Sequence, residues 1–363
     1  MLPRRSITVL CGAILTIGLA VFASGQSTVT ELNDAGWKAL REGQADRAVT
    51  HFLNALALRP SDPVLLFGAG AAFHAQGKQR DAMARLRKAL EIDPALTAAS
   101  ELLGRIAFDE GEADLAIKTY ENALKRAPGN AAITQQLNAW RKDAGVHQTF
   151  DSTKYDRFRV MFEGRAEEAL AKRATAILDS AFWRITRLLG EYPTGTIVTI
   201  LYTEQQFHDI TRAPGWAGGQ YDGRIRIPVA GAAEKPELFE RVLTHELSHA
   251  IVAAIAPHGV PAWLNEGMAQ YFDGSDVRAA RQRLKAAGQT IPLKVLGRGF
   301  GRMNAYQAQI AYDESLVAAN VMFDRPGFGW IRLLHRLGDG QTFEEAIVNF
   351  GFSYDDLEAP FKS

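Results

Sequence analysis

The residues of this sequence that are best arranged for chemistry are two histidines and a glutamate in the pentapeptide HELSH, at positions 245 to 249. His245 and His249 are four residues apart, so on a helix both imidazoles project from one face, one turn apart, and can bind the same metal ion. Glu246 lies between them, next to that face. Because a five-residue pattern is short, its interpretation depends on the elements around it.

A helix over residues 236–256 is predicted to carry these side chains. Pro236 pre-sets its first turn and Pro257 stops it, while acidic residues near its start suit the positive end of the helix dipole. The side opposite the histidines is apolar, with Leu243, Leu247 and Ile251. The helix is therefore expected to bury its back and to present the histidines to a cleft.

The next segment, PAWLNEGMAQYF from Pro261, is predicted to be a second short helix with one packed side. Glu266 does not lie on the packed side of this helix, so its carboxylate can reach back to the first helix, which carries His249. Two imidazoles and one carboxylate leave a tetrahedral zinc ion with one open position for water, which is the coordination that catalysis needs. The segment thus supplies a third ligand.

Small and polar residues near this glutamate have further expected roles. Gly267 and Ala269 would let the two helices come close, although ordinary helix packing also explains them. Asn265 and Asp273 are both candidates to orient a ligand histidine, and the sequence does not choose between them.

The pair HELSH and WLNEGMAQYF resembles the gluzincin metallopeptidases, the thermolysin-like clan, and in particular the peptidase-MA-like bacterial proteins. The similarity extends over about residues 150 to 360. It implies His245, His249 and Glu266 as zinc ligands and Glu246 as the general base. A GxMEN-type segment, which marks the aminopeptidase pattern, does not precede the first motif.

The chemistry that follows is peptide hydrolysis. Bound zinc lowers the pKa of a water molecule to about 7 and polarises the scissile carbonyl, while Glu246 takes the proton and passes it to the leaving amine. Tyr312, in a helical pattern at 311–323, occupies the place where similar proteins carry a transition-state tyrosine. Tyr306 and His335 are further candidates, and a buried structural role for Tyr312 is left open.

Residues 150–235, before the metal helix, have the pattern of a small mixed sheet. Strands are predicted at 158–164 and 196–202, with an amphipathic helix at 166–189 between them. The alternation of the segment RIRIPV at 224–229 stops at Pro228, which favours an edge strand. Such an edge can pair with an extended substrate, or it can simply precede the helix.

The first part of the chain is built from units that recur at a constant interval. The repeat is seen at four sets of equally spaced positions: Gly43, Gly77 and Gly111; Ala48, Ala82 and Ala116; Ala55, Ala89 and Ala123; Pro60, Pro94 and Pro128. Each unit is interpreted as a helix, a turn at the glycine, a second helix and a proline breaker, with the alanines where helices approach closely. These units resemble three tetratricopeptide repeats.

A polar helix at 130–144 is predicted to cap this array, with Trp140 packed on the third repeat. A partner-binding groove is one interpretation of the repeats, and a spacer or docking surface for the next domain is the other. The predicted inner helices are poor in Lys and Asn, so they lack the basic clamp that some such repeats use for terminal carboxylates.

The N-terminus is expected to direct export. Arg4 and Arg5 precede an uncharged apolar run, and small residues up to Gly25 suggest signal cleavage there, so residues 1–25 are predicted as a signal peptide. An uncleaved anchor facing outside the cytoplasm is the alternative, and only then is a membrane a partner. The only cysteine, Cys11, lies in this segment, so a metal in the mature chain must be held by His and carboxylate.

The predicted fold class is multidomain, with an all-α repeat solenoid at 28–145 followed by an α+β gluzincin-type domain at 150–363. In that domain the metal-site helices span 236–272 and a helical part spans 273–363. Forty-one basic residues balance 41 acidic ones, so charge does not favour nucleic acid as a partner.

The function expected from the sequence is a periplasmic or secreted zinc-dependent peptidase, with an endopeptidase favoured and an exopeptidase left open. It would hydrolyse exported proteins or peptides and bind a protein partner through the repeats. The alternative is a non-catalytic envelope scaffold or assembly factor, in which the peptidase-like domain serves only for docking.

Overall fold

The computed structural model describes residues 28–362 apart from 165–166, 212–217 and 302. The expected signal peptide therefore lies outside the described residues. The chain divides into two compact units: the first runs to residue 142 without 109–111, and the second comprises 109–111 and 143–363. Within the described ranges, no helix combines the length and apolar character needed to cross a bilayer.

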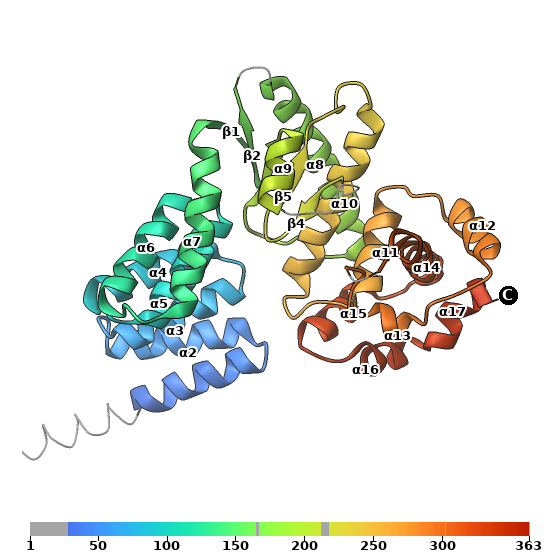
Figure 1. The fold of residues 1–363 in the computed structure, drawn as a ribbon. Coiled ribbons are helices and arrows are strands. Elements are labelled where there is room, and N and C mark those ends of the chain that lie inside the picture. Colours follow the sequence, from blue (N-terminus) through green and yellow to red (C-terminus); the bar gives the residue numbers. More distant parts are fainter. Residues whose placement is uncertain (1–27, 165–166, 212–217, 302, 363) are drawn as a thin grey trace, which may run out of the picture. The chain divides into compact units, whose positions relative to one another are not determined.

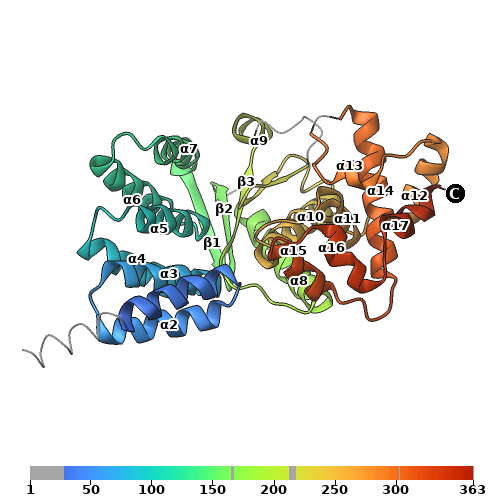
Figure 2. The ribbon, with the colours of Figure 1, turned by 90° about the horizontal axis from the view of Figure 1, so that it is seen from below.

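The first unit is a series of helices joined by short turns, with neighbours packed side by side (Figure 2). A helix over residues 28–41 comes first. It is followed by α2 (Ala45–Leu58), α3 (Pro63–Ala75), α4 (Gln79–Ile92), α5 (Thr97–Asp109), α6 (Ala113–Arg126) and α7 (Ala131–Val146). This confirms the predicted solenoid of helix pairs.

Glycine forms the turn within each repeat, as the period predicted. Gly43, Gly77 and Gly111 have φ angles of 71°, 72° and 80°, a left-handed conformation that glycine adopts without steric cost. The periodic alanines are buried at the contacts between helices, with exposed fractions between 0 and 5%. Larger side chains at these positions would force the helices apart.

A further periodic contact escaped the sequence interpretation. Three glycines with the same spacing as the repeats each face a large side chain of the following helix: Gly36 faces Phe52, Gly70 faces Leu86 and Gly104 faces Tyr120. A Cβ on any of them would lie within 2.8 Å of an atom of that side chain. The glycines therefore set the spacing of the two helices in every repeat.

The last helix of the series, α7, covers the third repeat as predicted. The indole of Trp140 stacks on Phe108, with ring centroids 4.8 Å apart, and contacts Tyr120 at 4.5 Å. Ile133 and Leu137 complete a buried stripe, and most of the remaining side chains of α7 up to Lys142 are exposed. This is the polar outer face expected of a capping helix.

The second unit contains one five-stranded mixed sheet in the order β1-β2-β3-β5-β4. Its strands are β1 (Phe150–Tyr155), β2 (Phe158–Glu163), β3 (Ile197–Tyr202), β4 (Gln220–Tyr221) and β5 (Ile225–Pro228). β1 is antiparallel to β2, β2 and β3 are parallel, β3 and β5 are parallel, and β4 is antiparallel to β5. The short 3-10 helix η1 (His147–Thr149) leads into β1, a strand that the sequence analysis did not predict.

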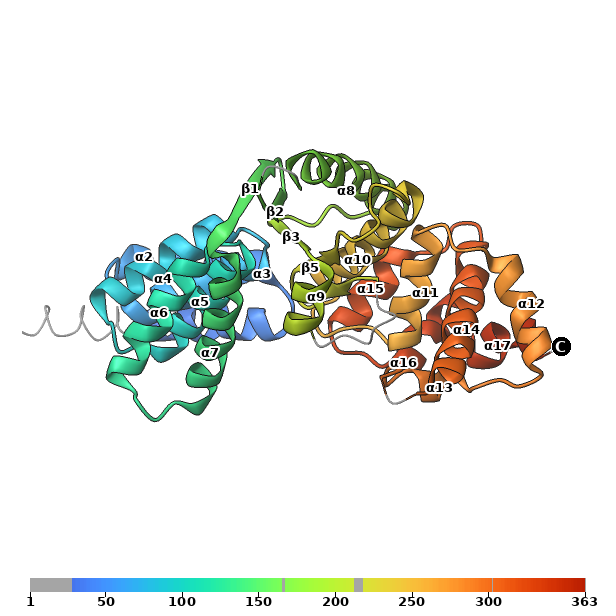
Figure 3. The ribbon, with the colours of Figure 1, turned by 45° about the horizontal axis from the view of Figure 1, so that its top comes forward.

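Helices cover the two faces of the sheet unequally (Figure 3). The main core joins inward residues of β2, β3 and β5 to α8 (Glu168–Leu189) and α10 (Pro236–Ile255). On the other face, α9 (Glu204–Thr211) contributes Phe207 to a small cluster with Val198, Ile200 and Tyr202 of β3.

The rest of the second unit is helical. It comprises α11 (Ala262–Phe272), α12 (Val277–Ala287), α13 (Leu293–Leu296), α14 (Ala305–Phe323), α15 (Trp330–Gly338), α16 (Phe343–Ile347), η3 (Val348–Phe350) and α17 (Tyr354–Lys362). α11 packs against both α10 and α14, and Figure 1 shows these three helices beside one another. The main core continues without a break from the sheet into these helices.

The prediction of an edge strand at 224–229 was wrong. β5 pairs with β3 on one side, and on the other side β4 pairs with it at Gln220↔Arg226 and Tyr221↔Ile225. Gly223, with φ of 100°, allows the chain to fold back so tightly that a two-residue strand becomes the last in the sheet. Pro228 lies beyond that short pairing, which explains why a proline is tolerated there.

Candidate metal centre

The helix α10 carries the HELSH sequence as its pattern predicts. It begins at Pro236, and Leu243, Leu247 and Ile251 are fully buried on its back. The His249 and Glu246 side chains are also buried, while His245 is half-buried. The helix therefore fixes all three chemical groups against the rest of the second unit.

His245, His249 and Glu266 come together. The Nε2 atom of His245 lies 3.4 Å from Oε2 of Glu266, and the Nε2 atom of His249 lies 3.7 Å from the same oxygen. All three ligand atoms lie within 4.8 Å of one another. In the part of the chain that the structure describes, this is the one group of three or more His, Cys, Asp or Glu side chains so arranged.

These positions fit a zinc ion. Zinc bonds to imidazole nitrogen and carboxylate oxygen are about 2.0–2.2 Å long, so neighbouring ligand atoms of a tetrahedral site are about 3.4 Å apart. The two nitrogen-to-oxygen distances of 3.4 and 3.7 Å match this spacing. Two nitrogens and one oxygen are also a donor set that zinc accepts, with a fourth position left for water or substrate.

Asp273 orients His245. Its Oδ2 atom lies 2.9 Å from Nδ1 of His245, so the ring donates its Nδ1–H to the carboxylate and keeps Nε2 for a metal. The other oxygen, Oδ1, accepts hydrogen bonds from the backbone N–H and the hydroxyl of Ser275, at 2.8 and 2.6 Å. Of the two candidates in the sequence, Asp273 thus serves His245, and Ser275 holds it in place.

Asn265 lies near the other histidine. Its amide acts favourably on the protonated form of His249. Within the described residues, however, neither Nδ1 of His249 nor Oδ1 of Asn265 has a partner at hydrogen-bond geometry, although both atoms are buried.

Two of the three candidate ligands have pKa values that favour the form that binds a metal. Burial raises the pKa of Glu266, but its hydrogen bond with His245 and the charges of both histidines outweigh burial, so the pKa falls below its usual value. Burial lowers the pKa of His249. An ionised carboxylate and a neutral imidazole are the forms that bind zinc.

The third candidate ligand, His245, and the neighbouring Glu246 both have raised pKa values. Burial lowers the pKa of His245, but its hydrogen bonds with Asp273 and Glu266 raise it to about 10, so a metal ion that binds Nε2 would have to displace a proton. Burial raises the pKa of the Glu246 carboxyl to about 7, against the opposing charge of His245. A carboxyl with that pKa can both accept and release a proton near neutral pH.

The structure places Tyr312 beside this site. Burial raises the pKa of its phenol, and the carboxylates of Glu266 and Glu246 raise it further. Its ring packs edge-on against Phe300, with centroids 5.1 Å apart. Gln270 of α11 donates a hydrogen bond to the Tyr312 carbonyl at 2.8 Å, which ties the tyrosine to the helix that carries Glu266.

Gly267 makes a close helix contact, but not the predicted one between the two metal-site helices. A Cβ at this position would overlap the backbone oxygen of Ser315, so the glycine faces α14. The sequence showed only that some neighbour must come close.

The other two candidate donors have different surroundings. Tyr306 is 56% exposed. His335 is exposed and pairs with the Glu191 carboxylate at 2.6 Å.

A second buried polar cluster, which the sequence did not predict, lies on the face of β5 opposite Ile225 and Ile227. Arg224 and Arg226 donate to the two oxygens of Asp143 at 2.9 and 2.8 Å, and Arg226 also donates to the Tyr202 hydroxyl at 2.6 Å. His147 bonds the same hydroxyl at 2.7 Å. The arginines are only 2 and 5% exposed, which is unusual for charged side chains.

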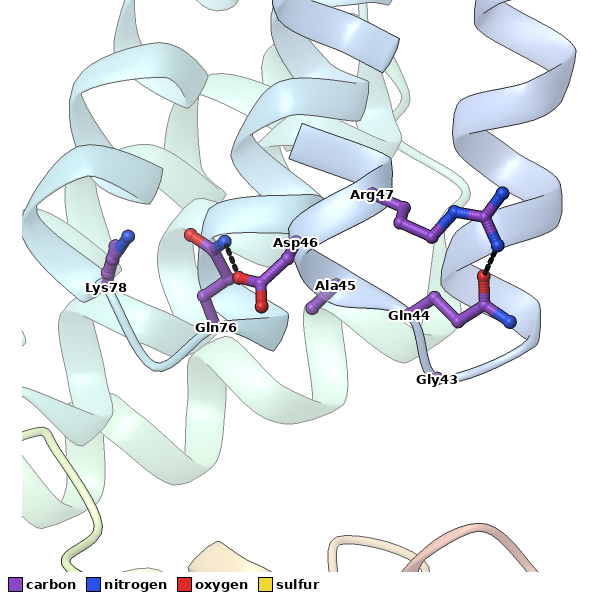
Figure 4. A pocket seen from close by; sticks show the side chains of 7 residues that line it. All are labelled: Gly43, Gln44, Ala45, Asp46, Arg47, Gln76 and Lys78. Atoms are coloured by element: carbon purple, nitrogen blue, oxygen red, sulfur yellow. Dashed lines mark hydrogen bonds between the residues drawn. The ribbon is translucent and has the colours of Figure 1, made fainter. Parts of the chain in front are cut away.

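The first unit has a surface hollow of about 530 Å³ (Figure 4). It is lined by Gly43, Gln44, Ala45, Asp46, Arg47, Gln76 and Lys78. Figure 4 shows two of its polar contacts, from Gln76 to Asp46 at 2.6 Å and from Arg47 to Gln44 at 2.7 Å. The hollow contains none of the predicted site residues.

Known families match both parts of the chain. The Peptidase MA superfamily matches residues 179–363, about half of the chain, and the tetratricopeptide repeat family matches residues 99–130. The first match contains HELSH, Glu266, Asp273 and Tyr312.

Individual relatives resemble the repeat part. The Hsp70-Hsp90 organizing protein of Triticum aestivum is 29% identical over 135 residues, which are 37% of this chain and 23% of that protein. The chain thus spans about a quarter of that relative's length. Two solved structures have a TM-score of 0.31 and 23% identity: the first TPR of Spaghetti (RPAP3) bound to an HSP90 peptide, and the Sgt2 TPR domain from Aspergillus fumigatus. They cover 33 and 32% of this chain, and 97 and 79% of their own chains.

Proposed function

Because the chain belongs to the Peptidase MA superfamily, we propose that its second unit is a zinc-dependent endopeptidase in which His245, His249 and Glu266 bind the metal. The observation that carries the proposal is the convergence of the two Nε2 atoms on one oxygen of Glu266, at 3.4 and 3.7 Å. This arrangement leaves a fourth position open, as catalytic zinc sites require. A closed structural site would use a fourth protein ligand.

Each polar side chain has a defined part in the proposed reaction. Zinc, when bound, would supply Lewis-acid chemistry and activate water at neutral pH. Glu246 takes a proton from the attacking water and delivers it to the leaving amine, for which a pKa of about 7 is suitable. Tyr312 donates a hydrogen bond from its phenol to the developing oxyanion. Asp273 keeps His245 in the tautomer that carries a proton on Nδ1.

The proposal extends to the rest of the chain. The repeats form a protein-interaction module, since stacked helix pairs of this kind present an extended surface to a partner. The apolar segment before residue 25 supports export, so the substrates proposed are proteins or peptides outside the cytoplasm.

Hydrolysis of fluorescein-labelled casein by wild-type protein and the Glu246→Gln variant tests the proposal, together with elemental analysis for zinc. Wild-type protein should hold one zinc per chain and release labelled fragments. Glu246→Gln should keep the zinc, because Glu246 is not a ligand, and lose about 10² to 10⁴ in rate, the usual contribution of a general base. Glu237→Gln, on the exposed first turn of the same helix, is the matched control.

Two outcomes would contradict the proposal. A wild-type chain with no zinc under metal-replete conditions would exclude the metal site. A zinc-loaded chain in which Glu246→Gln cleaves as fast as wild type would exclude the assigned general base. The first outcome would favour the alternative of a non-catalytic scaffold that acts through its repeats.

A further inference from the structure

Gly219, the residue just before β4, lies directly against the Glu246 side chain. A Cβ at position 219 would be 2.9 Å from both Cγ and Oε1 of Glu246. It would also be 3.0 Å from Cδ1 of Ile227 on β5. Real Cβ atoms essentially never approach a heavy atom so closely, so any side chain at this position would have to displace its neighbours.

The register of the sheet explains why position 219 meets this helix. β4 and β5 pair at Gln220↔Arg226 and Tyr221↔Ile225, so continuing the antiparallel ladder by one residue sets Gly219 opposite Ile227. Ile225 and Ile227 are buried in the core that includes α10. Since side chains alternate across a strand, position 219 points to the same face as these isoleucines, where α10 brings Glu246.

The glutamate has little room to move aside. Glu246 is only 6% exposed, and Ile227 is 1% exposed. The Cβ at 219 would lie 2.9 Å from Cγ of Glu246 as well as from its terminal Oε1, so rotation of the carboxylate group alone would not relieve the contact. The φ angle of Gly219 is not positive, so the requirement for glycine here is one of space and not of backbone conformation.

We propose that Gly219 is a positioning residue for the general base: its missing side chain forms the space that the Glu246 carboxylate occupies. The sheet then sets the position of the carboxylate as firmly as α10 does. This inference rests on the proposed role of Glu246, and its consequence is that an added methyl group shifts the base while leaving the three metal ligands in place.

The test compares Gly219→Ala with Gly218→Ala in the full chain. Gly218 is the matched control, because its Cβ would lie 3.1 and 3.8 Å from the two Val242 methyl groups, and Glu246 is not among the atoms within 4 Å of it. With labelled casein, Gly219→Ala should lower kcat about 10- to 100-fold, since a displacement near 1 Å has that effect on a reacting group. Its KM should stay within about threefold of wild type and its zinc content at one per chain, and Gly218→Ala should match wild type.

A melting experiment on the metal-free proteins separates this inference from the proposed activity. Gly219→Ala should lower the melting temperature by roughly 3 to 10 °C in the wild-type background, because overpacking a core strains it. In a Glu246→Ala background, which removes Cγ and the carboxylate, only the 3.0 Å contact with Ile227 remains, so the same substitution should lower the melting temperature by about half as much or less.

The melting result holds whether or not casein is cleaved, so failure of the proposed function and failure of this inference are distinguishable. An equal loss of melting temperature in both backgrounds would overturn the inference, because the contact with Glu246 would not be the constraint. So would an unchanged kcat for Gly219→Ala in an active enzyme.

Discussion

Replacement of Asp273 by Asn should weaken zinc binding, although the two side chains have the same shape. Asp273 accepts hydrogen bonds on both oxygens, from Nδ1 of His245 at 2.9 Å and from the backbone N–H of Ser275 at 2.8 Å. An asparagine has one acceptor oxygen and one NH₂ group. In either orientation, its NH₂ would face one of these two N–H donors, so one of the two bonds must break.

The magnitude follows from the kind of bond that is lost. A hydrogen bond to a charged group contributes about 1.5–3 kcal/mol. Loss of a partner that orients a ligand histidine typically costs 10- to 100-fold in metal affinity, which is about 1.4–2.7 kcal/mol. The two estimates agree, so the zinc Kd of Asp273→Asn should rise about 10- to 100-fold.

The measurement is a zinc titration at pH 7 against a chromophoric chelator of known affinity. Ser275→Ala removes the 2.6 Å hydroxyl bond but keeps the backbone bond, so its Kd should rise less than about tenfold. Asp276→Asn is the matched control, because Asp276 caps α12 and loses the same charge three residues away. A Kd for Asp273→Asn within twofold of wild type would refute the orienting role of Asp273.

Two further substitutions test other parts of the second unit. Tyr312→Phe should lower kcat on labelled casein about 10²- to 10³-fold with zinc content unchanged, whereas Tyr306→Phe should have no effect; equal kcat values for both would remove Tyr312 from the mechanism. Asp143→Asn should destabilise the protein by about 3–5 kcal/mol at pH 7 in urea unfolding, because it leaves two buried arginines short of a counter-charge. Burial raises the pKa of Asp143, but His147 and the two arginines outweigh it and lower the pKa from 3.8 to about 2; the stabilisation is therefore complete above about pH 4 and is lost as pH falls towards 2, and a gap between the two proteins that stays constant from pH 7 to 2 would contradict this.

The repeat architecture was predictable because its determinants are local and recur. A turn glycine such as Gly77 and a packing alanine such as Ala82 are constrained by neighbours close in sequence, so the same constraint reappears in the next repeat. The contact between Gly70 and Leu86 recurs in the same way but was missed. A glycine inside a helix usually lowers the stability of that helix. Its contribution to packing can be recognised only when the side chain that occupies the free space is known.

The pairing of His245 with His249 was also predictable, because helix geometry fixes the relative directions of these two side chains. The choice between Asn265 and Asp273 was not predictable from the sequence. Both residues lie close to Glu266 in the chain, and only the fold decides which of them reaches His245. Burial of Arg224 and Arg226 was hidden for a similar reason. Their counter-charge, Asp143, is far away in sequence, before the first strand of the sheet, and without it alternation in a strand indicates a solvated side.

The position of Tyr312 shows how the fold completes what the sequence leaves open. Gly267 crosses α14 at Ser315, where a methyl group on the glycine would overlap the backbone oxygen. Glu266 is the residue before this crossing on α11, and Tyr312 is about one turn before it on α14. The close approach at the glycine therefore brings Glu266 and the tyrosine to the same place, and the hydrogen bond from Gln270 to the Tyr312 carbonyl holds the two helices in register. A small residue in a sequence shows that some neighbour comes close, but only the fold identifies that neighbour as the helix that carries the tyrosine.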